Sequence, residues 1–169
     1  MDAFAAITRM KLTLSNVTRW LDKAEAHGQA RAFDPGTLLV ARLAPDQYPL
    51  IRQIQSACDS AKFAAARLSG KEAPRNPDTE TTLAEIRARI DATVAYLETF
   101  SESDFAGAEK RVVPLSFMPG KGLRAKDYLW EMSVPNFFFH VSHAYAILRH
   151  NGVDVGKADF VAPMTILDL

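Results

Sequence analysis

The sequence predicts an all-α protein organised as a four-helix bundle. Three segments carry apolar residues at alternating spacings of three and four, the pattern of a helix that buries one face. A fourth segment, late in the chain, is apolar over most of its length. Some of the connections are long, so we expect a crossover between the first two helices. A single domain over residues 1–169 follows, because a chain of this length normally encloses one core.

The first helix is predicted within residues 4–28. Its apolar stripe consists of Ile7, Met10, Leu14, Val17, Leu21 and Ala24. His27 and Gly28 are expected to end it, because a cation suits the carbonyl end of the helix dipole and glycine accepts the left-handed conformation. Residues 29–46 contain prolines and no sustained period, so they should cross the bundle, with a short extended piece at Thr37 to Ala41.

The second and third helices are bounded by residues that favour helix ends. Asp46 is a possible cap for the second helix, which Gly70 should close. Its stripe is Leu50, Ile54, Ala57, Ala61, Ala64 and Leu68. Thr82 and Glu85 have the spacing of a capping box for the third helix, which should end near Phe100. Its stripe is Leu83, Ile86, Ile90, Val94 and Leu97.

The segment before the last helix has a different character. Residues 110–122 combine β-branched residues, prolines and a glycine turn, which favours a short strand or hairpin insertion. From about Ala125 the pattern becomes helical again. Pro135 should break or kink this helix, because its ring clashes with the preceding turn and it has no amide hydrogen. Gly152 should stop the helix after Asn151.

Composition limits the function classes. Twenty Lys plus Arg balance twenty Asp plus Glu, so no net charge favours nucleic acid or anionic lipid. No apolar run approaches the roughly 20 residues that cross a bilayer. Cys58 is the single cysteine and cannot form an internal disulfide, and the first residues lack the pattern of a secretory signal. We therefore expect a cytoplasmic protein with no nucleic-acid or membrane partner.

Two histidines of the last helix raise the question of a metal site. A helical wheel directs His140 toward the core side and His143 toward its boundary. His140 is then either a buried imidazole bonded to a side chain or carbonyl, or a ligand of Zn²⁺, Ni²⁺ or Mn²⁺ together with His143 or Asp59. Metal binding needs about three converging ligands, and few candidates are present.

Other polar and apolar residues suggest surfaces. Gln55, Asp59 and Lys62 share one side of the second helix, which predicts a solvated face with an ion pair three residues apart. The last helix is apolar nearly all round, and Phe139 points away from its core side, which predicts a homodimer. The tail offers an alternative cover for Phe139 through Met164, Ile166 and Leu167.

Two long blocks, residues 42–70 and 135–160, resemble an uncharacterised bacterial family of domains of unknown function within the DinB/YfiT-like superfamily. The resemblance implies a DinB-like bundle with up-down-down-up topology. The superfamily's relatives are regarded as metal-dependent enzymes that use three histidines on two helices. Here His140 matches one such ligand, but Ala144 replaces its companion one turn later and the second helix offers no histidine. The closer family is associated with a recurring set: Gln55, Asp59, Lys62, His140, Tyr145 and Arg149.

Three hypotheses follow. The first is a dimeric, metal-free DinB-like bundle that binds a small ligand or a protein. The second is a metal-dependent hydrolase or transferase that uses His140 with His143 or Asp59 to lower the pKa of a bound water. The third is a structural dimer with a closed interior and no ligand-sized pocket near His140.

Overall fold

The structure is a computed structural model that describes residues 2–161 and 163–168. Its described residues form four long helices: α1 (Ala3–Arg31), α2 (Leu50–Ser69), α3 (Leu83–Glu98) and α5 (Val134–His150). The shorter elements are η1 (Pro35–Val40), η2 (Glu102–Phe105), η3 (Ala108–Lys110), β1 (Val112–Pro114), β2 (Gly122–Arg124), α4 (Ala125–Asp127), η4 (Tyr128–Ser133) and α6 (Lys157–Val161).

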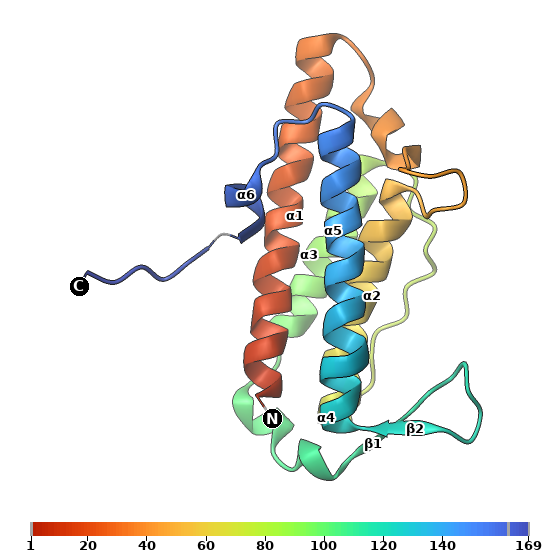
Figure 1. The fold of residues 1–169 in the computed structure, drawn as a ribbon, viewed down its shortest axis with the longest axis vertical. Helices are drawn as coiled ribbons and strands as arrows, with labels where there is room; N and C mark the ends of the chain where they lie inside the picture. The colour runs from red at the N-terminus through yellow and green to blue at the C-terminus, as the bar shows by residue number, and fades with distance from the viewer. Residues whose placement is uncertain (1, 162, 169) are drawn as a thin grey trace.

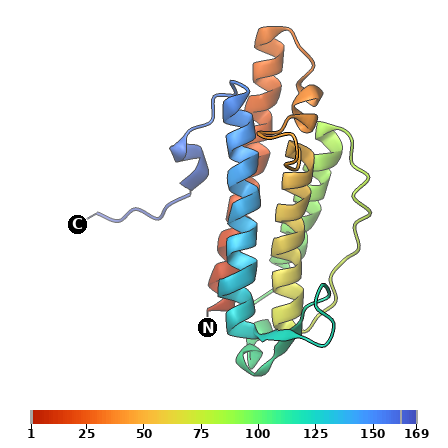
Figure 2. The same cartoon turned by 45° about the vertical axis from the view of Figure 1, so that its right-hand side comes forward.

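The long helices lie side by side around a common core (Figure 1). α1 runs in one direction, α2 and α3 run in the opposite direction, and α5 returns parallel to α1 (Figures 1 and 2). α2 packs most extensively against α5, and it also contacts α3 and α1. The apolar stripes expected for the first three helices face this core, with only Val94 half-buried among their members. The predicted mainly helical fold is therefore confirmed.

The end of α1 differs from the sequence prediction. The helix continues to Arg31, and Ala32 takes the left-handed conformation at its C-cap. Gly28 lies inside the helix, where a Cβ atom would approach the Pro35 side chain to 2.9 Å. The glycine thus allows the crossover to pack closely against α1, and it does not end the helix. The crossover forms the 3₁₀ helix η1, so the extended piece predicted at Thr37 to Ala41 was wrong.

The ends of α2 and α3 follow the expected chemistry, with one exception. Pro49 occupies the N-cap of α2, so the cap predicted at Asp46 was wrong. Gly70 closes α2 with a φ of 78°, which a glycine adopts without strain. The capping box of Thr82 and Glu85 is present at the start of α3.

The insertion before the last helix is a hairpin, as predicted. β1 pairs antiparallel with β2, so that Val113 lies opposite Leu123. The break or kink predicted at Pro135 takes the form of an irregular turn: the chain stays helical from Ala125 to His150, and the π-helical turn η4 lies just before Pro135. Pro135 cannot donate a backbone hydrogen bond to the preceding turn, which favours this local widening.

The tail forms a short helix that packs on α1. The ring of Phe160 in α6 stacks on Trp20 with centroids 5.6 Å apart and meets Tyr145 edge-on. Residues 163–168 extend away from the helices, and the apolar residues among them are exposed (Figure 1). Phe139 is 52% exposed, so the idea that the tail covers it was wrong for this chain. None of the described helices has the length and apolar character that crossing a membrane requires.

Candidate functional site

A groove of 280 Å³ runs between α2 and the η4–α5 segment. We call it the α2–α5 groove. Its lining residues are Tyr48, Arg52, Ser56, Asp59, Ser60, Phe63, Arg67, Tyr128, Met132, Ser133, Asn136 and His140. It combines aromatic rings with a larger number of hydrogen-bonding and charged groups, which can orient a polar ligand.

His140 lines one end of the groove with a defined tautomer. The amide Nε2 of Gln53 donates to the carbonyl oxygen of Tyr48 at 3.1 Å, so its Oε1 faces the imidazole. His140 Nδ1 is 2.8 Å from that Oε1 and must therefore donate its hydrogen. Burial lowers the pKa of His140, and the charges of His143 and Arg52 lower it further. The lowered pKa favours the neutral imidazole, in which Nε2 is an acceptor.

Asn136 lies one helical turn before His140 and lines the groove as well. Its Nδ2 donates to the Ser60 hydroxyl at 2.7 Å, and Ser60 donates to the carbonyl oxygen of Ser56. This contact joins α5 to α2 across the groove. Sequence reasoning missed Asn136, because it considered only the position one turn after His140.

Arg67 marks the opposite end of the groove. Its guanidinium lies 4.9 Å from the centre of the Phe63 ring and 5.6 Å from that of Tyr128. Its Nη1 also donates to the Tyr128 hydroxyl at 3.1 Å. Ser133, five residues after Tyr128 in the same π-helical turn, has a buried hydroxyl with no hydrogen-bond partner among the described residues.

Behind the groove, Arg89 of α3 organises an ionic network. Its side chain is 1% exposed and contacts three carboxylates: Asp59 at 2.8 Å, Asp78 at 3.0 Å and Glu80 at 3.0 Å. Asp78 and Glu80 belong to the connection over residues 71–82, which the network fastens to α2 and α3. No sequence signal singled out Arg89, although three acidic residues, Glu72, Asp78 and Glu80, precede it in that connection.

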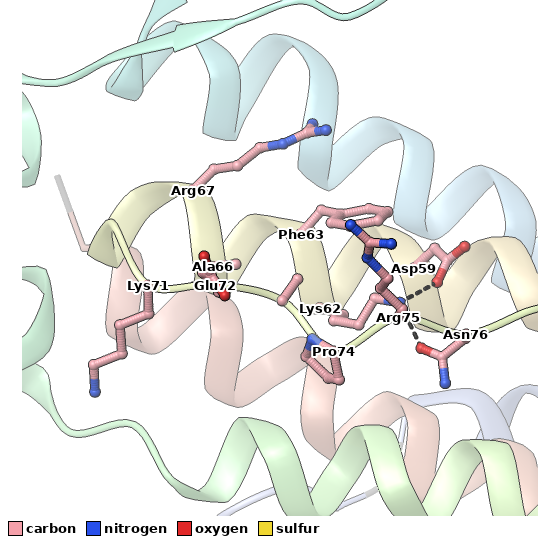
Figure 3. A pocket seen from close by; sticks show the side chains of 11 residues that line it. Asp59, Lys62, Phe63, Ala66, Arg67, Lys71, Glu72, Pro74, Arg75 and Asn76 are labelled. Atoms are coloured by element: carbon pink, nitrogen blue, oxygen red, sulfur yellow. Dashed lines mark hydrogen bonds and ion pairs between the residues drawn. The ribbon is translucent and has the colours of Figure 1, made fainter.

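The predicted residues of α2 belong to this network. Lys62 forms the expected ion pair with Asp59 at 2.8 Å and donates to Asn76 at 2.6 Å (Figure 3). Gln55 donates to Glu80 at 2.9 Å. The prediction of a solvated face was wrong, because the Lys62 side chain is only 3% exposed. The 71–82 connection covers it, a long-range contact that a helical wheel does not contain.

Asp78 shows how strongly the connection is fixed. Burial alone would raise the pKa of its carboxyl, but ion pairs with Arg52 and Arg89 outweigh burial and lower it. The residue also takes a φ of 54°, an unusual conformation outside glycine that the ion pairs compensate.

The remaining predicted residues lie elsewhere. Tyr145 packs edge-on against Trp20, and its hydroxyl donates to the carbonyl oxygen of Val155. Arg149 faces Asp154 at 3.6 Å on an exposed surface. His143 is bonded through Nδ1 to the carbonyl oxygen of Phe139, in its own helix. The structure therefore brings Gln55, Asp59 and Lys62 together, places His140 across the groove from Asp59, and separates Tyr145 and Arg149 from them.

Comparison with known proteins agrees with this architecture. A sequence profile described as a domain of unknown function (DUF1993) matches residues 4–161. The chain belongs to the DUF1993 family. A crystal structure of a DinB family member protein from Shewanella denitrificans is 44% identical, covers 96% of this chain and 93% of its own, and superposes with a TM-score of 0.93. The resemblance to an uncharacterised DinB-like family is thus confirmed. No curated protein matches the chain.

The metal site that the DinB-like scaffold implies does not fit the residues of this DUF1993 domain. Among residues 2–161 and 163–168, no three His, Cys, Asp or Glu side chains converge on one point. Asp59 is occupied by Lys62 and Arg89, and His143 is turned toward its own helix. Cys58 is fully buried, and burial raises the pKa of its thiol to about 12. Of these candidate ligands, His140 and Asp59 line the groove, and among the described residues only the Nε2 atom of His140 has no recorded partner.

Proposed function

We propose that this DUF1993 domain is a metal-free binding module of DinB-like four-helix-bundle topology that takes a small molecule in the α2–α5 groove. The observation that carries the proposal is the groove itself: neutral His140 and Asn136 offer hydrogen bonds beside the rings of Phe63 and Tyr128. Its volume of 280 Å³ is just below the range for small-molecule pockets, about 300 to 1,000 Å³. A compact ligand is therefore expected.

The presence of this groove also supports the binding hypothesis over a purely structural one. A structural dimer requires no ligand-sized hollow, whereas the groove contains a buried hydroxyl, Ser133, whose hydrogen-bonding capacity is unused among the described residues. A buried polar group of this kind usually finds a partner, and a bound molecule can provide one.

The metal-dependent alternative relies on one feature, the available Nε2 of His140. A hydrolase or transferase of this type would need His143 or Asp59 to leave its present partners and turn toward His140. Releasing Asp59 would leave Lys62 and Arg89 without an acceptor that both now share, which costs several kcal/mol for buried charges. The metal-free proposal requires no such rearrangement.

Metal content decides between the two. Untagged protein, purified without chelators or a nickel column, would be analysed by plasma mass spectrometry before and after incubation with Zn²⁺, Ni²⁺ and Mn²⁺. We expect well below 0.1 equivalent of metal per chain, on the order of trace contamination in a site that lacks three ligands. About one equivalent, lost in His140→Gln but retained in the surface control His150→Gln, would overturn the proposal.

The same module is proposed to act as a cytoplasmic homodimer. Phe139 on α5 is half exposed next to His143, with ring centroids 4.1 Å apart, and nothing in the described chain covers it. An exposed aromatic ring on a long apolar helix is typical of an interface between copies. Light scattering coupled to size-exclusion chromatography should give a molar mass twice that of one chain. The Phe139→Ser variant should have a molar mass closer to that of one chain. A monomeric wild-type protein would contradict this part.

A further inference from the structure

The end of the α2–α5 groove near Arg67 has unbalanced charge. The carboxylate of Asp59 in the groove is neutralised by Lys62 and Arg89, and Arg52 is paired with Asp78. Arg67 forms no ion pair with any residue that the structure describes. Lys71 nearby is paired with Asp104 at 2.6 Å, so it does not compete for an anion.

The aromatic rings orient Arg67 toward the groove. Phe63 and Tyr128 both contact the guanidinium, and the Tyr128 hydroxyl accepts one of its five N–H groups. In Figure 3 the side chain extends over Phe63 toward the ribbon of α5, whereas Lys71 points the opposite way. A guanidinium fixed in this manner loses little side-chain entropy when it binds a ligand.

Two hydroxyl donors accompany the guanidinium. Tyr128 accepts from Arg67 and keeps its own hydrogen available, because no described residue accepts it. Ser133 is buried and has no partner among the described residues, and it lines the groove with Tyr128. The groove therefore offers the Arg67 guanidinium with the Tyr128 hydroxyl beside it, the Ser133 hydroxyl also lines it, and its one carboxylate, Asp59, is already neutralised.

We propose that the groove binds a small organic carboxylate with a planar apolar body. One unpaired guanidinium matches one negative charge, and its fork geometry matches the two oxygens of a carboxylate. Phe63, Tyr128 and Met132 provide the apolar walls for the body of the ligand. His140 lines the other end of the groove, seven residues and about 10 Å of helix rise beyond Ser133, where its imidazole can hydrogen-bond a longer ligand.

This inference rests on the proposed function, and a matched pair of ligands separates the two. Benzoate carries the carboxylate, and benzamide has the same shape without the charge. Binding would be measured by calorimetry and by amide chemical shifts of the wild-type protein. We expect saturable binding of benzoate in the groove at least tenfold tighter than that of benzamide. Phenyl phosphate should bind no tighter than benzoate.

Variants test the assigned donors. Arg67→Gln should weaken benzoate at least tenfold, and Tyr128→Phe and Ser133→Ala should each weaken it about threefold, which corresponds to about 0.7 kcal/mol per lost hydrogen bond. The control Arg149→Gln removes an exposed arginine that faces Asp154 and does not line the groove, and it should leave binding unchanged. Circular dichroism melting would show that each variant folds.

The outcomes are distinct. Equal binding of benzoate and benzamide in the groove would overturn the carboxylate assignment and leave the small-molecule function standing. Tighter binding of phenyl phosphate would replace carboxylate by phosphate and also overturn the inference. Absence of groove shifts with benzoate, benzamide and a broad set of neutral fragments would overturn both the inference and the proposed function.

Discussion

Replacing Arg89 by methionine tests whether the ionic network is a structural fastening for the 71–82 connection. The Arg89 side chain is 1% exposed and carries ion pairs to Asp59, Asp78 and Glu80. Methionine fills a similar volume but leaves the three carboxylates facing one another. The substitution therefore isolates the charge from most of the packing.

The expected loss follows from the partners that remain. Removing one member of a buried ionic cluster typically costs about 3 to 5 kcal/mol. Asp59 keeps Lys62, Asp78 keeps Arg52 and Glu80 keeps Gln55, and all three carboxylates are partly solvated, so we take the lower end, about 3 kcal/mol. That is a large fraction of the 5 to 15 kcal/mol, roughly, that stabilises a domain.

Urea unfolding at pH 7 measures this difference. The control is Arg124→Met, which removes an 80%-exposed arginine paired with Asp127 and should cost less than about 1 kcal/mol. Because ion pairs lower the pKa of Asp78, its contribution is present above its unfolded pKa of about 3.9 and disappears as pH falls through the folded value. The difference in unfolding free energy between the wild-type protein and Arg89→Met should therefore become smaller below pH 4. Equal losses for the two variants, or a difference that becomes larger in acid, would refute the reasoning.

Three further predictions concern single positions. Cys58 should resist alkylation in the native protein at pH 8 and react when the protein unfolds, because burial raises the pKa of its thiol to about 12. Mass spectrometry would measure the labelling, and rapid labelling of the native protein would contradict the burial of Cys58. His140 should titrate below its ordinary pKa of about 6.5 in an NMR pH series, because burial lowers its pKa. The folded protein should therefore lose stability as the pH falls from about 6.5 through the folded pKa, and a titration midpoint at or above 6.5 would refute the desolvation argument. Gly70→Ala should lower the free energy of unfolding by about 1 to 2 kcal/mol, because the φ of Gly70 is 78° and a Cβ atom there would displace the Arg111 side chain. The control Gly156→Ala should change the stability little, and similar melting temperatures for the two variants would argue against the left-handed cap.

Local patterns in the sequence predicted the helical framework well. Apolar spacing, the Thr82 capping box, the Gly70 cap and the irregular turn before Pro135 depend on residues within one or two turns of each other. The end of α1 was placed too early because Gly28 serves a contact with Pro35, seven residues away, and its role is invisible without the crossover.

The site was harder to predict, because it depends on contacts between distant segments. Gln55, Asp59 and Lys62 form a polar face on a helical wheel, and only the 71–82 connection shows that this face is covered. Arg89 appears as a surface residue of α3 until its carboxylate partners are placed around it. His140 was correctly expected to point inward, whereas its partner Gln53 comes from a helix 87 residues earlier.

The central claim is that the α2–α5 groove binds a small molecule without a metal. The most direct measurement is an amide chemical-shift map of chelator-treated protein titrated with a small-molecule fragment set that includes benzoate. The account predicts saturable shifts that cluster on the groove around Arg67, Ser133 and Asn136, unchanged when Zn²⁺ is added. Shifts that lie elsewhere, or that arise in the groove only after Zn²⁺ is added, would contradict it.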